Sequence, residues 1–103
     1  MYNWDEKKNQ QLILERGISF DEIVEFIEED INPVAVEKNS NYKGQYKMYL
    51  LINEYIYIVP FEIRDKKYWL ITAWKDRKAN KLYKEGKLWK DTMNQQKKSK
   101  KST

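Results

Sequence analysis

The sequence contains no cysteine and no histidine. The first absence excludes disulfides, thiolate metal sites, iron–sulfur clusters and cysteine nucleophiles. The second removes the commonest general base and metal ligand, so Ser-His-Asp catalysis is impossible. With only three glycines, the chain has no glycine-rich phosphate loop. No apolar run reaches the roughly 18 residues of a membrane span, and no apolar signal segment opens the chain. We therefore expect a cytoplasmic protein with no membrane partner and with neither a metal nor another cofactor.

Charge is distributed unevenly along the 103 residues, which are enough for one compact domain. Residues 1–65 hold 7 Lys and Arg against 13 Asp and Glu, a net charge of −6, whereas residues 66–103 hold 13 against 3, a net charge of +10. Such a split favours contact between the basic part and a polyanion, most plausibly nucleic acid. The alternative interpretation is that the lysines only keep a small protein in solution.

Three segments have the composition and the end signals of helices. The first consists of helix formers and ends at Gly17, a residue suited to the left-handed cap conformation. The second opens with a capping box, Ser19 with Glu22, and continues with an apolar stripe at helical spacing. The third has Asp76 as its N-cap and Gly86 as its stop. The predicted helices are residues 4–16, 20–30 and 77–85.

Between the second and third helices, β-branched and aromatic residues predominate, as in strands, and the predicted strand over residues 55–63 places Tyr57 and Val59 on the same face. Pro60 lacks a donor for the ladder and predicts a bulge or an edge position. Short connections predict an antiparallel four-stranded sheet, covered on one face by the helices, in a single α+β domain over residues 1–86. Residues 87–103 are expected to form a basic C-terminal tail that is partly disordered. The predicted strands are residues 34–36, 46–52, 55–63 and 68–74.

The densest group of chemically useful residues joins the last strand to the third helix. Lys75, Arg77 and Lys78 are placed to bind phosphates together with the N–H groups of the helix start. Trp74 could stack on an unpaired base. RNA cleavage by the 2′-hydroxyl needs a base, an acid and a cation, and Arg77, Lys75 and Tyr83 could fill the last two roles. The structural alternative is that Trp74 and Tyr83 belong to the core.

Four short motifs, spread over about residues 2–85, carry a family resemblance. They are Trp4-Asp5-x-x-Lys8-Asn9, Arg16-Gly17-Ile18-Ser19-Phe20-Asp21-Glu22-Ile23, Leu70-Ile71-Thr72-Ala73, and Arg77-Lys78-Ala79 followed by Tyr83. In this order they resemble the BrnT family of bacterial toxins. The resemblance implies a RelE-like fold and a metal-independent endoribonuclease that inhibits translation. It also implies an inhibitor encoded beside the toxin, an antitoxin of the ribbon-helix-helix type, and a dimer within the toxin–antitoxin complex.

The chain departs from the family pattern at two places. The family often has Lys-His-Gly where this chain has Glu15-Arg16-Gly17, and Ile-Ser-Ala-Arg where it has Ile71-Thr72-Ala73-Trp74. We expect Arg77 to supply the cation that is missing at the strand end, with Lys75, Thr72 and Tyr83 as the other catalytic residues. The expected RNA-binding residues are Lys78, Lys81, Lys84, Trp74, Arg16 and Lys8.

Two other functions are compatible with the same residues. The first is a non-catalytic module that holds nucleic acid with its basic part or docks a protein with its acidic helices. The second is a small structural domain. The sequence does not separate catalysis from binding.

Overall fold

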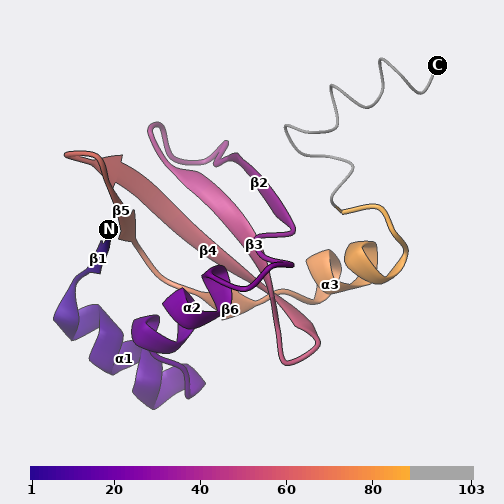
Figure 1. Ribbon diagram of the computed structural model, residues 1–103, viewed down its shortest axis with the longest axis horizontal. Coiled ribbons are helices and arrows are strands. Elements are labelled where there is room, and N and C mark those ends of the chain that lie inside the picture. The colour runs from indigo at the N-terminus through magenta and orange to yellow at the C-terminus, as the bar shows by residue number, and fades with distance from the viewer. Residues whose placement is uncertain (89–103) are drawn as a thin grey trace.

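The computed structural model describes residues 1–88, which form one mixed sheet and three helices (Figure 1). This arrangement confirms the α+β class. None of the helices in this part of the chain is long and apolar enough to cross a membrane. The expected basic tail lies, from residue 89 onward, outside the described residues. In chain order the elements are β1 (Tyr2–Trp4), α1 (Glu6–Arg16), α2 (Phe20–Ile27), β2 (Ala35–Lys38), β3 (Tyr46–Ile52), β4 (Tyr55–Arg64), β5 (Lys67–Leu70), β6 (Trp74–Lys75) and α3 (Arg77–Lys84).

The sheet has the order β1-β5-β4-β3-β2, and β6 pairs with β4. Strands β2 to β5 form the predicted antiparallel meander. The prediction was wrong at the N-terminus, where β1 runs parallel to β5 and places Tyr2 opposite Tyr68. Those two rings stack with centroids 5.4 Å apart. Three residues are too few to show strand alternation, so β1 leaves no pattern in the sequence, and the first helix starts at Glu6 rather than at Trp4.

The N-terminal motif of the family resemblance holds α1 against α2. Gly17 ends α1 in the left-handed conformation, with φ of 68°, and Ser19 forms the predicted capping box with Glu22. Buried Asn9 accepts a hydrogen bond from the backbone N–H of Phe20 at 2.8 Å. Trp4 stacks on Phe20 with centroids 5.5 Å apart. This motif therefore has a clear role in folding, whether or not it also contributes to activity.

Helices lie on both faces of the sheet, contrary to the prediction of one covered face. Along β4, Tyr57 and Val59 pack in the core that contains α1 and α2 residues, whereas Ile56 and Ile58 pack with Ala79 of α3. Successive side chains of a strand point to opposite faces, so α3 lies across the sheet from α1 and α2. The sequence carried the signal, because residues 55–61 are an almost unbroken apolar run, typical of a strand buried on both faces.

The predicted fourth strand, residues 68–74, is two strands separated by a bulge. Phe61 pairs with Leu70 and Ile58 pairs with Trp74. Two residues of β4 thus face three residues, 71–73, on the other side, which is one more than an unbroken ladder allows. The bulge lies opposite Pro60, as its missing N–H predicted; the Pro60 carbonyl still accepts from Ile71 N–H at 2.9 Å.

Two polar side chains fix the start of α3 on the sheet. Asp76 caps the helix by accepting from the N–H of Ala79 at 2.9 Å, as predicted. Buried Asn80 accepts from the N–H of Ile56 at 3.0 Å and so ties α3 to β4. Packing continues beyond the helix, since Leu88 is buried in the core on this face.

Candidate functional site

An open cleft of about 470 Å³ lies beside β6 and is lined by Arg16, Tyr57, Trp74 and Lys75. Arg16 is the last residue of α1, just before the Gly17 cap. Lys75 in β6 is the register partner of Tyr57 in β4, so their side chains share one face of the sheet. The cleft therefore depends on three elements that are distant in sequence.

The lining of this cleft is cationic and contains no carboxylate. Tyr57 is 8% exposed, and burial, reinforced by the negative charge of Glu22, raises the pKa of its hydroxyl. A phenol with the ordinary tyrosine pKa of about 10 is already protonated at neutral pH, and the upward shift preserves this state, so the O–H can donate a hydrogen bond. The Lys75 ammonium lies 5.5 Å from the ring centroid of Tyr55, which helps to hold it beside the strand. Two cations and one hydrogen-bond donor thus face the same opening.

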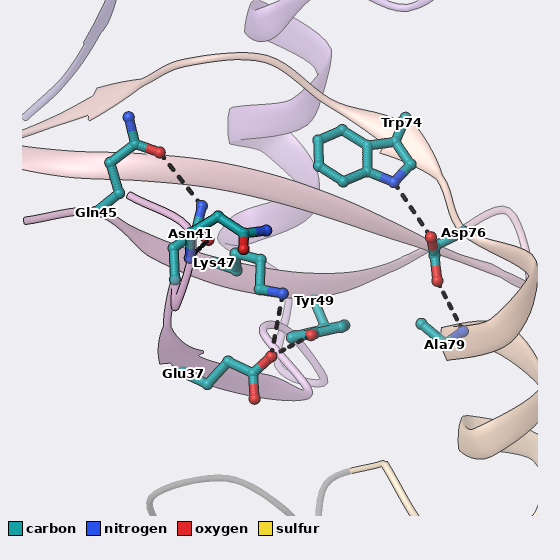
Figure 2. A network of polar contacts seen from close by, with 9 residues as sticks. Glu37, Asn41, Gln45, Lys47, Tyr49, Trp74, Asp76 and Ala79 are labelled. Atoms are coloured by element: carbon teal, nitrogen blue, oxygen red, sulfur yellow. Dashed lines mark hydrogen bonds and ion pairs between the residues drawn. The ribbon is translucent and has the colours of Figure 1, made fainter. Parts of the chain in front are cut away.

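The indole of Trp74 is held in place from one edge. Its Nε1–H donates to one carboxylate oxygen of Asp76 at 3.2 Å, while the other oxygen of Asp76 caps α3 (Figure 2). Trp74 is half-buried against the core on the α3 side and also lines the cleft. The structural and functional interpretations of this residue are therefore compatible.

The structure brings together three of the expected site residues, namely Arg16, Trp74 and Lys75, and leaves the others elsewhere. Arg77 and the α3 lysines are exposed but are not among the residues that line the cleft. Tyr83 is half-buried and packs with the core on the α3 side, and Lys8 is half-buried on α1. Thr72 is half-buried and lines a second cleft, of about 460 Å³, that shares Trp74 with the first. The α3 lysines are Lys78, Lys81 and Lys84.

Sequence reasoning placed Tyr57 in a strand and missed its place in the cleft. The alternation along residues 55–63 put Tyr57 on the correct face. Its pairing with Lys75 could not be foreseen, because the bulge at residues 71–73 shifts the register by one residue. Pro60 was the signal in the sequence, because it predicts a bulge, and a bulge shifts the strand pairing beyond it by one residue.

Among residues 1–88, no group of three or more potential ligand residues is arranged to hold a metal ion. No known protein-family model matches the chain, and no curated protein matches it either. The resemblance to BrnT toxins thus rests on the motifs alone, several of which have clear folding roles.

Proposed function

We propose that this protein is a metal-independent endoribonuclease whose catalytic cleft is formed by Arg16, Tyr57, Trp74 and Lys75. The observation that supports the proposal is the meeting of two cations with a buried, protonated phenol in a cleft that no carboxylate lines. An RNA phosphate suits such a lining, because Arg16 and Lys75 can give it charge-assisted hydrogen bonds and no carboxylate lines the cleft.

The proposed reaction is attack of a ribose 2′-oxygen on the adjacent phosphorus. The new bond from phosphorus to the 2′-oxygen forms as the bond to the 5′-oxygen breaks, leaving a 2′,3′-cyclic phosphate and a 5′-hydroxyl. Arg16 and Lys75 stabilise the added negative charge of the phosphorane. Tyr57 donates its proton to the departing 5′-oxygen. Because the lining offers neither imidazole nor carboxylate, the 2′-hydroxyl proton passes to water in the open cleft, and the Tyr57 phenolate takes a proton back from water after the step.

The remaining expected residues act in this proposal outside the reacting centre. Arg77 and the lysines of α3 are exposed on the element that follows β6, where they can contact phosphates further along the strand. Such contacts add affinity for RNA that depends on the salt concentration and not on the nucleotide sequence of the RNA. Arg16 and Lys75 take over the catalytic cation role for which the sequence favoured Arg77.

The biological role in this proposal is that of a toxin in a type II toxin–antitoxin pair. The support is the motif resemblance together with the acidic first part of the chain, which suits a basic antitoxin. Induced expression should arrest growth, and co-expression of the short reading frame next to the gene should relieve the arrest. Growth without arrest at full expression would count against the toxin role.

The decisive test is cleavage of labelled messenger RNA by the full-length protein in EDTA. We expect cleavage with 2′,3′-cyclic phosphate ends, reduced about 100-fold or more in Arg16→Gln, because a cation on the phosphorane is lost. Arg77→Gln is the matched control, since it removes another exposed arginine that does not line the cleft; at saturating RNA, where its loss of affinity does not count, its cleavage rate should stay close to that of the wild type. Loss of cleavage in Arg77→Gln but not in Arg16→Gln would show that the catalytic site lies at α3, as the sequence predicted.

A second candidate function, binding of RNA without cleavage, is favoured by one specific observation. Arg16, Lys75 and Tyr57 provide charge and a proton, but no lining side chain is a strong base. Tight binding of RNA that stays intact in the same assay would select this function over catalysis.

A further inference from the structure

The α3 face of the sheet carries a second open cleft because α3 covers only one end of it. The helix packs over Ile56 and Ile58, and the sheet continues beyond it. There Lys47 and Pro60, register partners in β3 and β4, line a cleft of about 460 Å³. Loop residues that include Asn41 and Gln45 line this cleft together with Trp74, and Figure 2 shows these side chains coming from separate segments of the chain.

Hydrogen bonds hold the two sides of this second cleft in place. In the loop, Asn39 donates to the side chain of Gln45 at 3.3 Å and accepts from the backbone of Asn41 at 3.1 Å. Across the cleft, Asp76 fixes the edge of the Trp74 indole. An aromatic ring and an amide-bearing loop therefore face a common space before any ligand binds, which lowers the entropy cost of binding.

The chemistry of this cleft differs from that of the first. Lys47 pairs with Glu37 at 3.4 Å, so its charge is partly neutralised (Figure 2). What remains is an aromatic surface with amide and hydroxyl groups, those of Asn41 and Thr72 included, and no lining carboxylate. A ligand with a flat π-face and a polar edge fits this set better than a phosphate does.

The two clefts meet at an exposed strand. In the described chain, β6 pairs with β4 and with no other strand, and its residue Lys75 is exposed. Adjacent residues of a strand point to opposite faces, which directs Lys75 to the first cleft and Trp74 toward the second. A single-stranded ligand can pass around this edge with its phosphate at Lys75 and its neighbouring base at Trp74.

We propose that the second cleft binds an unpaired nucleobase next to the phosphate held in the first cleft. The base stacks on Trp74, and the Asn41 amide contacts its polar edge. This inference rests on the proposed function, because it takes single-stranded RNA as the ligand. It adds a base-binding subsite on the opposite face of the sheet and makes Trp74 the residue shared by both.

The test compares two labelled strands bound by the full-length protein at about 0.15 M salt. One is a short 2′-O-methyl oligoribonucleotide, which cannot be cleaved, and the other is the same strand with abasic residues. Phosphate contacts, including those of the basic C-terminal part, are equal for both, so the affinity ratio reports the base alone. We expect the intact strand to bind about 10-fold tighter, as stacking of one base would give.

Three variants test whether Trp74 is the residue responsible for this difference in affinity between the intact and the abasic strand. Trp74→Leu should bring the ratio close to one, whereas Trp69→Leu, a half-buried tryptophan that does not line the cleft, should preserve it. Arg16→Gln should weaken both strands equally. A wild-type ratio near one would overturn the base subsite, while binding that still depends on Arg16 would leave the proposed function standing. Failure of both strands to bind would overturn both proposals.

Asn41→Ala provides a second test that does not depend on the folding of the Trp74 variant. Asn41 is exposed in the loop, so its loss should not disturb the core. We expect this variant to reduce the spread of affinities among the four homopolymer 2′-O-methyl strands, because an amide that reads a base edge is removed. An unchanged spread would overturn the assignment of Asn41 to the base.

Discussion

The two faces of the sheet differ in how completely they are covered. Within residues 1–88, thirteen buried residues form the core shared with α1 and α2, whereas six form the core shared with α3, so most of the apolar burial lies on one side. The face that α3 covers only in part keeps room for the second cleft. This difference suggests that the first face supplies most of the stability, and that the second face has room for a ligand group beyond the phosphate held in the first cleft.

Among the variants that test this comparison of the two faces, Phe20→Ala should cause the largest loss of stability. Phe20 is 0% exposed at the centre of the larger core, so its truncation should lower the free energy of unfolding by about 3–5 kcal/mol. Urea unfolding followed by circular dichroism measures the loss. Leu14→Ala, on α1 but 85% exposed, is the control and should change stability by less than about 0.5 kcal/mol. Equal effects of the two variants would show that the core on this face is not the main source of stability.

Asn80→Ala tests the attachment of α3 to the smaller core. The change leaves the buried N–H of Ile56 without its acceptor, which should cost about 1–3 kcal/mol in the same unfolding experiment. Lys81→Ala, at the next and exposed position of α3, is the control. A cost below that of Lys81→Ala would mean that water satisfies the Ile56 N–H and that α3 is held by apolar packing alone.

High pH should weaken the protein through tyrosines on both faces. Burial, together with the hydrogen bond to Glu37, raises the pKa of Tyr49 above its ordinary value near 10, and burial also raises the pKa of Tyr57. The folded chain then keeps protons that the unfolded chain releases, so the contribution of these tyrosines to stability is constant below about pH 10 and falls above it. Each such tyrosine contributes a slope of at most about 1.4 kcal/mol per pH unit.

Tyr49→Phe should make that alkaline decline shallower. The measurement is urea unfolding at a series of pH values from neutral to about pH 11, compared with the wild-type protein. Tyr42→Phe, which removes the hydroxyl of a 61% exposed tyrosine, is the control. A decline that is as steep in Tyr49→Phe as in the wild type would assign it to other groups.

The smallest effect on stability should come from the lining of the second cleft. Asn41→Ala should leave the free energy of unfolding within about 0.5 kcal/mol of the wild type, because the residue is exposed and its side chain packs in neither core. Thermal unfolding is a sufficient measurement. A loss of more than about 1 kcal/mol in the free energy of unfolding would show that the loop also stabilises the fold, and that the two faces differ less than proposed.

Local signals in the sequence predicted most of the elements. The capping box at Ser19, the left-handed Gly17 and the Asp76 cap are each set by a few neighbouring residues, and the structure confirms them. Strand β1 and the side of the sheet taken by α3 could not be predicted in the same way. Both depend on pairing between segments that are distant in sequence, such as Tyr2 with Tyr68.

The candidate site was predictable only in part for the same reason. Chemical type and the family resemblance were enough to select Arg16, Lys75 and Trp74. They could not show that Arg16, at the end of α1, lines the same cleft as β6. Nor could they add Tyr57, because its pairing depends on how the chain crosses residues 71–73.

The bulge opposite Pro60 decides which face of the sheet receives which chemical group. In an unbroken ladder continued from Leu70, Trp74 would lie opposite Tyr57 and Lys75 opposite Ile56, so the indole and the ammonium would exchange faces. The number of residues between β5 and β6 thus decides which face of the sheet receives Trp74 and which receives Lys75. The length of this connection is therefore a better guide to the ligand-binding groups of a related chain than a match of residue types.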